Sequence, residues 1–297
     1  MALGSATATA HFFTVDVEEH FQVSVFDRVV DRADWERLPS RVEANVDVLL
    51  ELLDRHGTVG TFFTLGWIAD RKPALVRRIA AAGHEIASHG WWHRRVSTLT
   101  AAEFREEVRR SKQTLEDVAG QAVVGFRAPS FSIVPGVEWA FDVLLEEGYR
   151  YDSSLFPIRR PDYGYPAAIT VPHQLERAAG PLLELPMATT VLAGLRVPAA
   201  GGGYLRQFPY RLIARAFREH AAVGLPAMFY IHPWEVDPNQ PRLSVPALTR
   251  WRHYGGLART LPRLERLLRE FRFTSVARHF AIPDGPTALD AWTRIAV

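Results

Sequence analysis

The feature that most constrains the fold of this chain is an alternation of short buried strands with amphipathic helices. Runs rich in β-branched and aromatic residues, such as HFFTVDV at 11–17 and VGTFFTL at 59–65, are typical of strands. Between them, residues 42–53 carry apolar side chains at a helical period, and Gly57 follows as a stop signal. Strands that alternate with helices pair in parallel. The pattern therefore predicts an α/β fold, either a parallel (β/α) barrel or an open parallel sheet.

The same alternation continues along most of the chain. We expect further strands at residues 84–87, 123–127, 227–231 and 273–275. We expect further helices at residues 73–82, 100–120, 136–148, 209–222 and 257–270. Residues 158–208 are rich in Pro and Gly and are interpreted as an irregular insertion of short strands and loops. The expected organisation is one domain at 11–280, preceded by a disordered arm at 1–10 and followed by a tail at 281–297.

Composition excludes several classes of function. Among the 297 residues there is no cysteine, so disulfides and thiolate metal sites are impossible. The net charge is +2 and charges of both signs are interleaved, so no nucleic-acid partner is expected. We see no apolar run of the roughly 18 residues that a membrane span needs, and no signal peptide at the start. We therefore expect a cytoplasmic protein, and nothing in the sequence specifies its oligomeric state.

Acidic side chains follow the first predicted strand. Because successive strand residues point to opposite faces, Asp16 and Glu18 are expected on the same face. Two carboxylates aimed the same way repel each other unless a cation or a proton lies between them. An acidic start to a following helix would explain Glu18, but not Asp16, which lies within the strand.

Two histidines, His89 and His93, follow the strand at 84–87. Neutral imidazole is the commonest protein ligand for a divalent metal, and two of them provide half of a tetrahedral site. The helical H-E-x-x-H zinc motif does not fit, since His89 lies five residues after His84. A pair of surface histidines in a turn is the alternative, and the spacing alone does not decide between the two.

Further unusual polar residues, Arg127 and His232, also stand at strand ends. In a parallel barrel all these ends share one face, where such folds place their chemistry. A carboxylate and two imidazoles make a three-ligand metal site, a second carboxylate can accept a proton from water, and a remote histidine can protonate a leaving group. An isolated histidine is more often structural than catalytic, and a strand-end arginine usually pairs with an acid. Their joint occurrence in this order favours the catalytic interpretation.

The motifs together resemble the polysaccharide deacetylases, carbohydrate esterase family 4, with the NodB-like fold. The segments that carry the resemblance are TVDVEE (14–19), SHGWWH (88–93), FRAPSF (126–131), YDSSLFP (151–157) and FYIHPWE (229–235). The DVE and HPWE variants resemble a branch associated with bacterial exopolysaccharide and exosortase loci. The resemblance implies a distorted parallel (β/α) barrel and a metal-dependent N-deacetylase. Its substrate would be an N-acetylated glycan, in an exopolysaccharide or its precursor.

The resemblance also implies roles for individual residues. Glu18, His89 and His93 would hold a divalent metal, with Zn²⁺ as the expected ion. Asp16 would be the base, Arg127 would orient it, and His232 would protonate the departing amine. The residues expected to contact substrate or to steer His232 are Trp91, Trp92, Pro129, Phe131, Asp152, Tyr204, Trp234 and Glu235, with Asp152 or Glu235 as the alternatives for steering. Stacking walls for a sugar ring would be formed by Trp91, Trp92, Trp234 and Tyr204. We expect a neighbouring carboxylate to hold the pKa of His232 near neutrality despite burial.

Two positions depart from the family pattern. Val17 occupies the place of the usual metal-binding second Asp, so Glu18, on the same strand face as Asp16, is expected to ligate instead. Gly90 replaces the usual Ser or Thr after the first metal-binding His.

Two other functions are compatible with the same residues. One is an amidohydrolase that acts on a small amide, as in family members resembling allantoinases. The other is a carbohydrate-binding protein that kept the cleft and lost the chemistry. The presence of both Asp16 and His232 argues against the second alternative, because a binding protein needs neither a base nor an acid.

Overall fold

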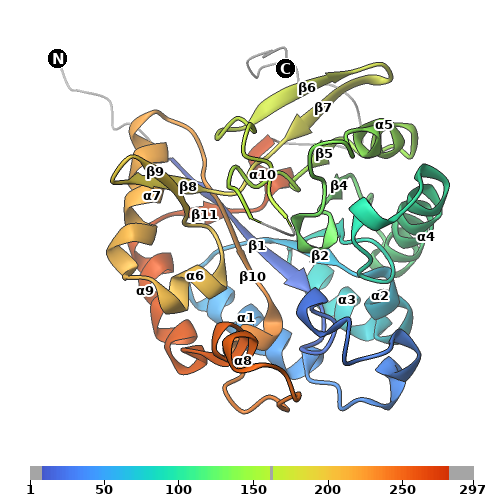
Figure 1. The fold of residues 1–297 in the computed structure, drawn as a ribbon, viewed down its shortest axis with the longest axis horizontal. Helices are drawn as coiled ribbons and strands as arrows, with labels where there is room; N and C mark the ends of the chain where they lie inside the picture. Colours follow the sequence, from blue (N-terminus) through green and yellow to red (C-terminus); the bar gives the residue numbers. More distant parts are fainter. Residues whose placement is uncertain (1–8, 161–162, 281–297) are drawn as a thin grey trace.

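A nine-stranded sheet forms the centre of the protein, whose computed structural model describes residues 9–160 and 163–280. The strand order is β10-β1-β2-β3-β4-β5-β7-β6, and β11 pairs with the start of β1. Figure 1 shows β1 crossing the middle of the molecule, with helices on both sides of the sheet. Every pairing in this sheet is parallel except that of β6 with β7. Most of the expected arm and all of the expected tail lie outside the described residues.

The elements follow the chain in an order close to the predicted alternation. The strands are β1 (His11–Val17), β2 (Thr61–Thr64), β3 (Glu85–Ser88), β4 (Gly125–Phe126), β5 (Tyr151–Asp152), β6 (His173–Arg177), β7 (Gly180–Glu184), β8 (Thr189–Leu192), β9 (Leu195–Pro198), β10 (Met228–Ile231) and β11 (Phe273–Thr274). The α-helices are α1 (Val42–Arg55), α2 (Gly66–Arg71), α3 (Pro73–Ala81), α4 (Ala101–Ala119), α5 (Trp139–Glu146), α6 (Gly202–Gln207), α7 (Tyr210–Ala222), α8 (Ala247–Tyr254), α9 (Thr260–Glu270) and α10 (Val276–Phe280). Short 3₁₀ turns occur at Ser24–Phe26, Arg32–Arg37, Val96–Thr98, Pro129–Phe131, Pro233–Val236 and Leu257–Arg259.

The two sides of the sheet are linked by isolated bridges rather than by full strand pairing. After β7, the chain returns to β10, where Met187 pairs with Met228 and Gly201 pairs with Tyr230, both in parallel. The amide of Tyr230 donates to the carbonyl of Ala200 at 2.9 Å. The α/β prediction is confirmed, and the two isolated bridges join the segment after β7 to β10.

The largest departure from the predicted elements lies in the segment expected to be an irregular insertion. Its strand β7 pairs with β5 in the main sheet, with Leu183 opposite Tyr151, so part of this segment completes the sheet. The helices α2, α6, α8 and α10 were not predicted. They contain six, six, eight and five residues, too few for a helical period to stand out.

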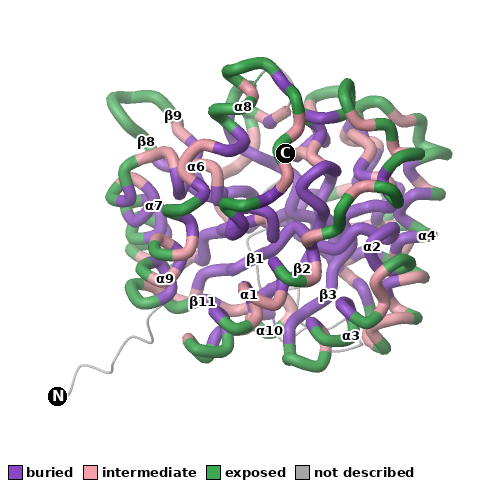
Figure 2. Tube along the Cα trace, turned by 90° about the horizontal axis from the view of Figure 1, so that it is seen from below, coloured by how far each residue is buried: buried purple, intermediate pink, exposed green. Residues whose placement is uncertain are grey.

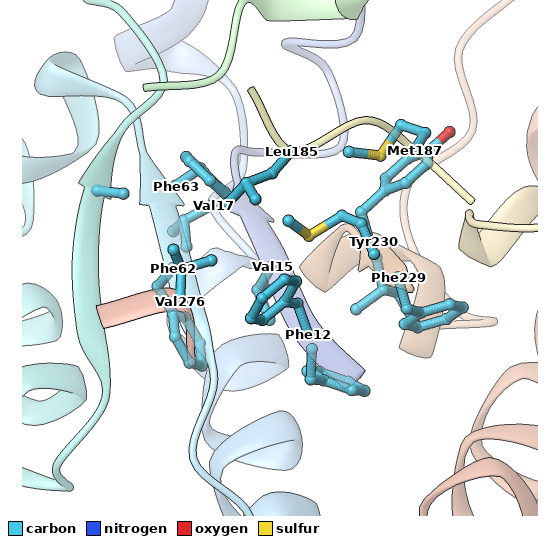
Figure 3. Packing of buried hydrophobic residues seen from close by; sticks show 14 of the residues in the cluster. Phe12, Val15, Val17, Phe62, Phe63, Leu185, Met187, Phe229, Tyr230 and Val276 are labelled. Atoms are coloured by element: carbon cyan, nitrogen blue, oxygen red, sulfur yellow. The ribbon is translucent and has the colours of Figure 1, made fainter. Parts of the chain in front are cut away.

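The core forms because β1 is buried on both faces, as is usual for a strand in a parallel sheet covered by helices. Phe13 packs against Phe229 from β10, with ring centroids 5.5 Å apart. Phe12, Val15 and Phe62 belong to the same buried cluster (Figure 3). Each such side chain contributes roughly 1.5–3 kcal/mol on burial. Figure 2 shows this buried interior surrounded by an exposed rim, from which the β8–β9 hairpin projects. At the tip of that hairpin Leu195 is 71% exposed.

The amino-terminal ends of the strands are closed by α10. The amide of Ala277 donates to Glu85, whose carboxyl also accepts from Thr61 (2.6 Å) and Tyr151 (2.7 Å). Burial raises the pKa of Glu85. The opposite, carboxyl-terminal ends remain for the side chains described below. No helix within residues 9–160 and 163–280 combines the length and the apolar character that crossing a membrane requires.

Candidate active site

Strand β1 places Asp16 at the carboxyl-terminal edge of the sheet, buried and pointing at a buried arginine. Its Oδ1 accepts a hydrogen bond from Arg127 Nη1 at 2.6 Å, and the same nitrogen donates to Thr14 Oγ1 at 2.8 Å. The guanidinium also donates to the carbonyl and the hydroxyl of Ser153, at 3.1 and 3.0 Å, and lies 4.1 Å from the Phe63 ring centroid. Because Arg127 is held on all these sides, its hydrogen bond holds Oδ1 of the Asp16 carboxylate in one orientation.

The loop after β3 carries His89 and His93 into the same region. Gly90 has φ 76°, in the left-handed region that suits glycine. His93 has φ 52°, a value that is uncommon for residues other than glycine. The backbone N–H groups of residues 91 and 92 both donate to Glu107 Oε2 at 3.0 Å. This carboxylate from α4 therefore holds the turn that brings the two imidazoles together.

Glu18, His89 and His93 form a buried group whose candidate ligand atoms all lie within 4.8 Å of one another. Glu18 Oε2 lies 2.8 Å from His93 Nε2, yet it has no hydrogen-bond partner, which is uncommon for a buried oxygen. His89 Nδ1 donates to the carbonyl of Arg127 at 2.8 Å, which leaves Nε2 with its lone pair. This donor set fits a divalent metal, which would satisfy the unpartnered carboxylate oxygen.

The protonation states of these groups also suit a metal ligand set. Burial lowers the pKa of His89 to about 4, so its imidazole is neutral at pH 7. Burial raises the pKa of Glu18, but the neighbouring His93 and His232 outweigh it and lower that pKa to about 2. Glu18 is therefore a carboxylate, and a ligand must be deprotonated.

His232 follows β10 and faces the two carboxylates from the other side. Its Nε2 lies 3.6 Å from Glu18 Oε1 and 4.0 Å from Asp16 Oδ2. Its Nδ1 donates to Glu235 Oε1 at 2.9 Å, and Trp234 stacks on the ring with centroids 5.0 Å apart. Burial lowers the pKa of His232, but Glu18, Glu235 and Asp16 raise it further, to about 9. The sequence predicted that a neighbouring carboxylate holds the pKa of His232 near neutrality. The pKa lies above neutrality because three carboxylates act together.

Two family models match the chain. Residues 21–140 match the family "Polysaccharide deacetylase", and residues 153–281 match a "Domain of unknown function (DUF3473)". The region 21–140 is therefore similar to the polysaccharide deacetylases. Asp16 and Glu18 lie just ahead of the first match, and His232 lies within the second. The predicted resemblance is confirmed.

Curated relatives agree with this family. The chain is 29% identical over 115 residues to the peptidoglycan deacetylase of Helicobacter pylori, which is 38% of each chain. It is 32% identical over 93 residues to the peptidoglycan-N-acetylglucosamine deacetylase of Bacillus cereus, 31% of this chain and 34% of the relative. It is 32% identical over 96 residues to the chitooligosaccharide deacetylase of Bradyrhizobium sp., 32% of this chain and 42% of the relative. The matched region thus spans less than half the length of each relative.

Solved structures show the same fold over nearly the whole chain. A Mycobacterium smegmatis protein assigned to the polysaccharide deacetylases superposes with a TM-score of 0.61 at 24% identity, covering 94% of this chain and 91% of that one. The Puue allantoinase superposes with a TM-score of 0.63 at 18% identity, covering 97% and 94%. At these identities the likeness concerns the fold.

The two acids proposed to steer His232 differ in position. Glu235 contacts its imidazole, whereas Asp152 is fully buried and accepts hydrogen bonds from the amide (2.9 Å) and hydroxyl (2.6 Å) of Ser154. In β7, Glu184 lies opposite Asp152. Burial and the neighbouring Asp152 raise the pKa of Glu184 well above its usual range. The prediction that Asp152 could steer His232 is wrong, because its carboxyl is occupied elsewhere in the sheet.

The tryptophans expected to form sugar-binding walls are largely enclosed. Trp91 is 3% exposed, and the guanidinium of Arg110 lies 3.6 Å from its ring centroid. Trp234 is 5% exposed, and its ring lies between those of His232 and His253. Its Nε1 donates to Glu18 Oε1 at 3.2 Å. Neither presents a free ring face, which corrects the stacking role expected for them. Trp92 is partly buried.

The remaining residues predicted to contact substrate are Phe131, Pro129 and Tyr204. Phe131 is 6% exposed and packs edge-on against Tyr230, with centroids 4.8 Å apart. Pro129 is buried in the same turn. Tyr204 hydrogen-bonds Tyr163 through their hydroxyls at 2.8 Å. A substrate role for these three stays a prediction.

Sequence reasoning missed two residues that support the site. Glu107 lies in the middle of the predicted helix at 100–120, where an exposed glutamate is the ordinary expectation. Arg206 lies in the Pro- and Gly-rich segment, and it pairs with Glu235. A glutamate that accepts from the amides of the histidine loop can be suspected from the sequence. No local pattern distinguishes Arg206 from the many other arginines of the chain.

Proposed function

We propose that this chain is a metal-dependent hydrolase that removes the acetyl group from an N-acetylated sugar in a polysaccharide. One observation carries the proposal, namely that an oriented carboxylate, a three-ligand group and a histidine converge at one edge of the sheet. The family and the deacetylase relatives support the same reaction class. In this reaction the amide C–N bond breaks, water supplies the new C–O bond, and acetate and a free amine are released.

Glu18, His89 and His93 would hold the metal, with Zn²⁺ as the proposed ion. When bound, such an ion polarises the amide carbonyl and stabilises the negative charge that develops on its oxygen. The hydrogen bond from His89 Nδ1 to the Arg127 carbonyl orients one ligand, and Glu107 holds the turn between the two histidines.

Asp16 and His232 divide the proton transfers. Arg127 occupies Asp16 Oδ1, so Oδ2 is the oxygen that can accept the proton of the attacking water. His232 Nε2 lies on the far side of the carboxylates and is protonated below about pH 9, so it can protonate the departing nitrogen. Glu235 holds the imidazole from behind through Nδ1.

The proposed substrate class is a bacterial exopolysaccharide or its precursor. The support for this finer assignment is the DVE and HPWE form of the first and last motifs, together with the second family match at residues 153–281. The relatives named for peptidoglycan and chitooligosaccharides support an N-acetylated hexosamine at the cleaved position.

The test is acetate release by the purified protein from a panel of N-acetylated polysaccharides and oligosaccharides, before and after chelation and Zn²⁺ addition. Asp16→Asn should keep the metal and lose turnover, whereas Glu18→Gln should lose the metal first. Loss of metal in both variants would make Asp16 a ligand as well. Allantoin and simple amides belong in the panel, because turnover of these alone would replace the proposal with a small-amide hydrolase. Glycan binding without acetate release would indicate a binding protein.

A further inference from the structure

Arg206, in the segment matched by the domain of unknown function, is a buried charge with a full set of partners. It is 2% exposed, and its Nε donates to the carbonyl of Gly255 at 2.9 Å. Its Nη2 donates to the carbonyls of Arg252 (3.0 Å) and His253 (2.6 Å) at the end of α8. Its Nη1 donates to Glu235 Oε2. Three carbonyls thus anchor the guanidinium, and the remaining nitrogen is aimed at one carboxylate.

That carboxylate lies between Arg206 and the candidate proton donor. Glu235 Oε2 pairs with Arg206, while Oε1 accepts from His232 Nδ1 at 2.9 Å and from the His232 amide at 3.2 Å. Glu235 is 1% exposed, so water does not replace these contacts. Because both oxygens are engaged, the carboxylate cannot rotate without breaking either pair.

A glycine closes the remaining side of the carboxylate. A Cβ on Gly202, the first residue of α6, would lie 2.5 Å from Glu235 Oε1, closer than real atoms approach. The next residue, Gly203, would place a Cβ 3.4 Å from Arg206 Nη1, an ordinary contact. Gly202 therefore lets the start of α6 lie directly against Glu235.

We propose that Arg206 is a positioning residue for the reaction, acting through Glu235 on His232. By holding Glu235, it keeps the proton on Nδ1 of the imidazole and directs Nε2 toward Asp16 and Glu18. This inference rests on the proposed function, since it gives Arg206 a purpose only if His232 transfers a proton. The alternative is that Arg206 merely ties α6 to the end of α8.

The test compares Arg206→Met with Arg263→Met in the 297-residue, Zn²⁺-loaded chain. Arg263 is the matched control, because it donates to the carbonyls of Leu205 and Phe208 on the same helix without contacting Glu235. With an N-acetylglucosamine oligomer as the probe, we expect Arg206→Met to lower kcat by about 10- to 100-fold at nearly unchanged KM. Arg263→Met should stay within roughly twofold of the parent. A loss confined to KM, or equal losses in both variants, would overturn the inference.

A double-mutant cycle separates positioning from general structural support. In a His232→Ala background, Arg206→Met should change kcat by no more than roughly twofold, because its route of action is gone. The same fractional loss in both backgrounds would show that Arg206 acts elsewhere. If His232→Ala itself leaves turnover at the parent rate, the proposed function is wrong about the proton donor. If His232→Ala lowers turnover but Arg206→Met leaves it at the parent rate, the inference about Arg206 is wrong and the proposed function is unaffected.

Gly202→Ala provides a second route in case Arg206→Met does not fold, since it removes no hydrogen-bonding group. We expect it to lower kcat about 10-fold or more by displacing Glu235, while Gly203→Ala stays near the parent. Crystal structures of the two variants give a readout that does not depend on activity. The 2.9 Å contact between His232 and Glu235 should be lost in Gly202→Ala and kept in Gly203→Ala. An unmoved imidazole in Gly202→Ala, with parent turnover, would contradict the proposal.

Discussion

The two halves of the chain contribute to the site in different ways. The half up to β5 repeats strand and helix in parallel, and its strand ends supply Asp16, the metal-ligand candidates and Arg127. The half after β5 contains the antiparallel pairs β6–β7 and β8–β9, and it supplies His232 with its support. Figure 1 shows β10 returning from this second half to lie beside β1.

The difference shows how the candidate chemistry is assembled. The proposed base and the ligand group come from the ends of β1 and β3, which are separated in the sheet by β2 alone. The proposed proton donor comes from a strand more than 200 residues away in sequence, and its partner Glu235 pairs with Arg206. The first half should therefore control metal binding, and the second half should control turnover with the metal in place.

The largest expected effect is on metal binding in the first half. His93→Ala removes one of three candidate ligands, so we expect the affinity for Zn²⁺ to fall by more than about 100-fold. His84→Ala is the matched control, because His84 is also buried and contacts the amide of Gly60 outside the group. Competition with a chromophoric chelator measures the affinity. Parent-like affinity in His93→Ala would remove that residue from the metal site.

The next effect separates the halves. His232→Ala should keep the metal but lower turnover by about 10²- to 10⁴-fold, the range for one general acid. Since only protonated His232 donates, and its pKa is about 9, parent activity should fall as pH rises through about 9. The variant should lack this basic limb. His220→Ala, a buried histidine of α7, serves as control. An unchanged profile in His232→Ala would assign that histidine a structural role.

A smaller effect concerns stability. Phe62→Ala, in β2 of the first half, should lower the free energy of unfolding by about 3–5 kcal/mol, because it leaves a cavity in the buried core. Leu195→Ser, at the exposed tip of the β8–β9 hairpin, should change it by no more than about 0.5 kcal/mol. Urea denaturation followed by circular dichroism measures both. Comparable losses would mean that the hairpin tip packs against something else.

The smallest effect concerns the contact between the start of β1 and the residue before β10, which joins the two halves. His11, at the start of β1, accepts a hydrogen bond from the amide of Ala227 just before β10, and burial lowers its pKa to about 4. The unfolded state therefore binds the proton more tightly. The free energy of unfolding should fall by up to about 1.4 kcal/mol per pH unit below about pH 6.5 and level off near pH 4. His11→Phe should show a shallower acid dependence, and an equal slope would contradict this.

Much of the fold and the ligand group could be read from the sequence because both depend on local patterns. A capping box at Thr100 and Glu103 begins α4 within the predicted helix at 100–120, and β1 spans the predicted residues. The period of two placed Asp16 and Glu18 on one face before any contact was known. Parallel strands bring their ends to one edge of the sheet, so the strand-end positions predicted that these side chains converge, whereas the family resemblance assigned their roles.

Only the tertiary structure decided which acid supports His232 and what supports that acid. Asp152 and Glu235 are equally plausible in the sequence, but the register of β5 with β7 buries Asp152 beside Glu184, and the turn after β10 folds Glu235 back onto the imidazole. Arg206 reaches Glu235 across 29 residues, by packing that no hydrophobic period records. Periodicity specifies which face of an element is buried, whereas the partner of a buried charge depends on how distant elements pack together.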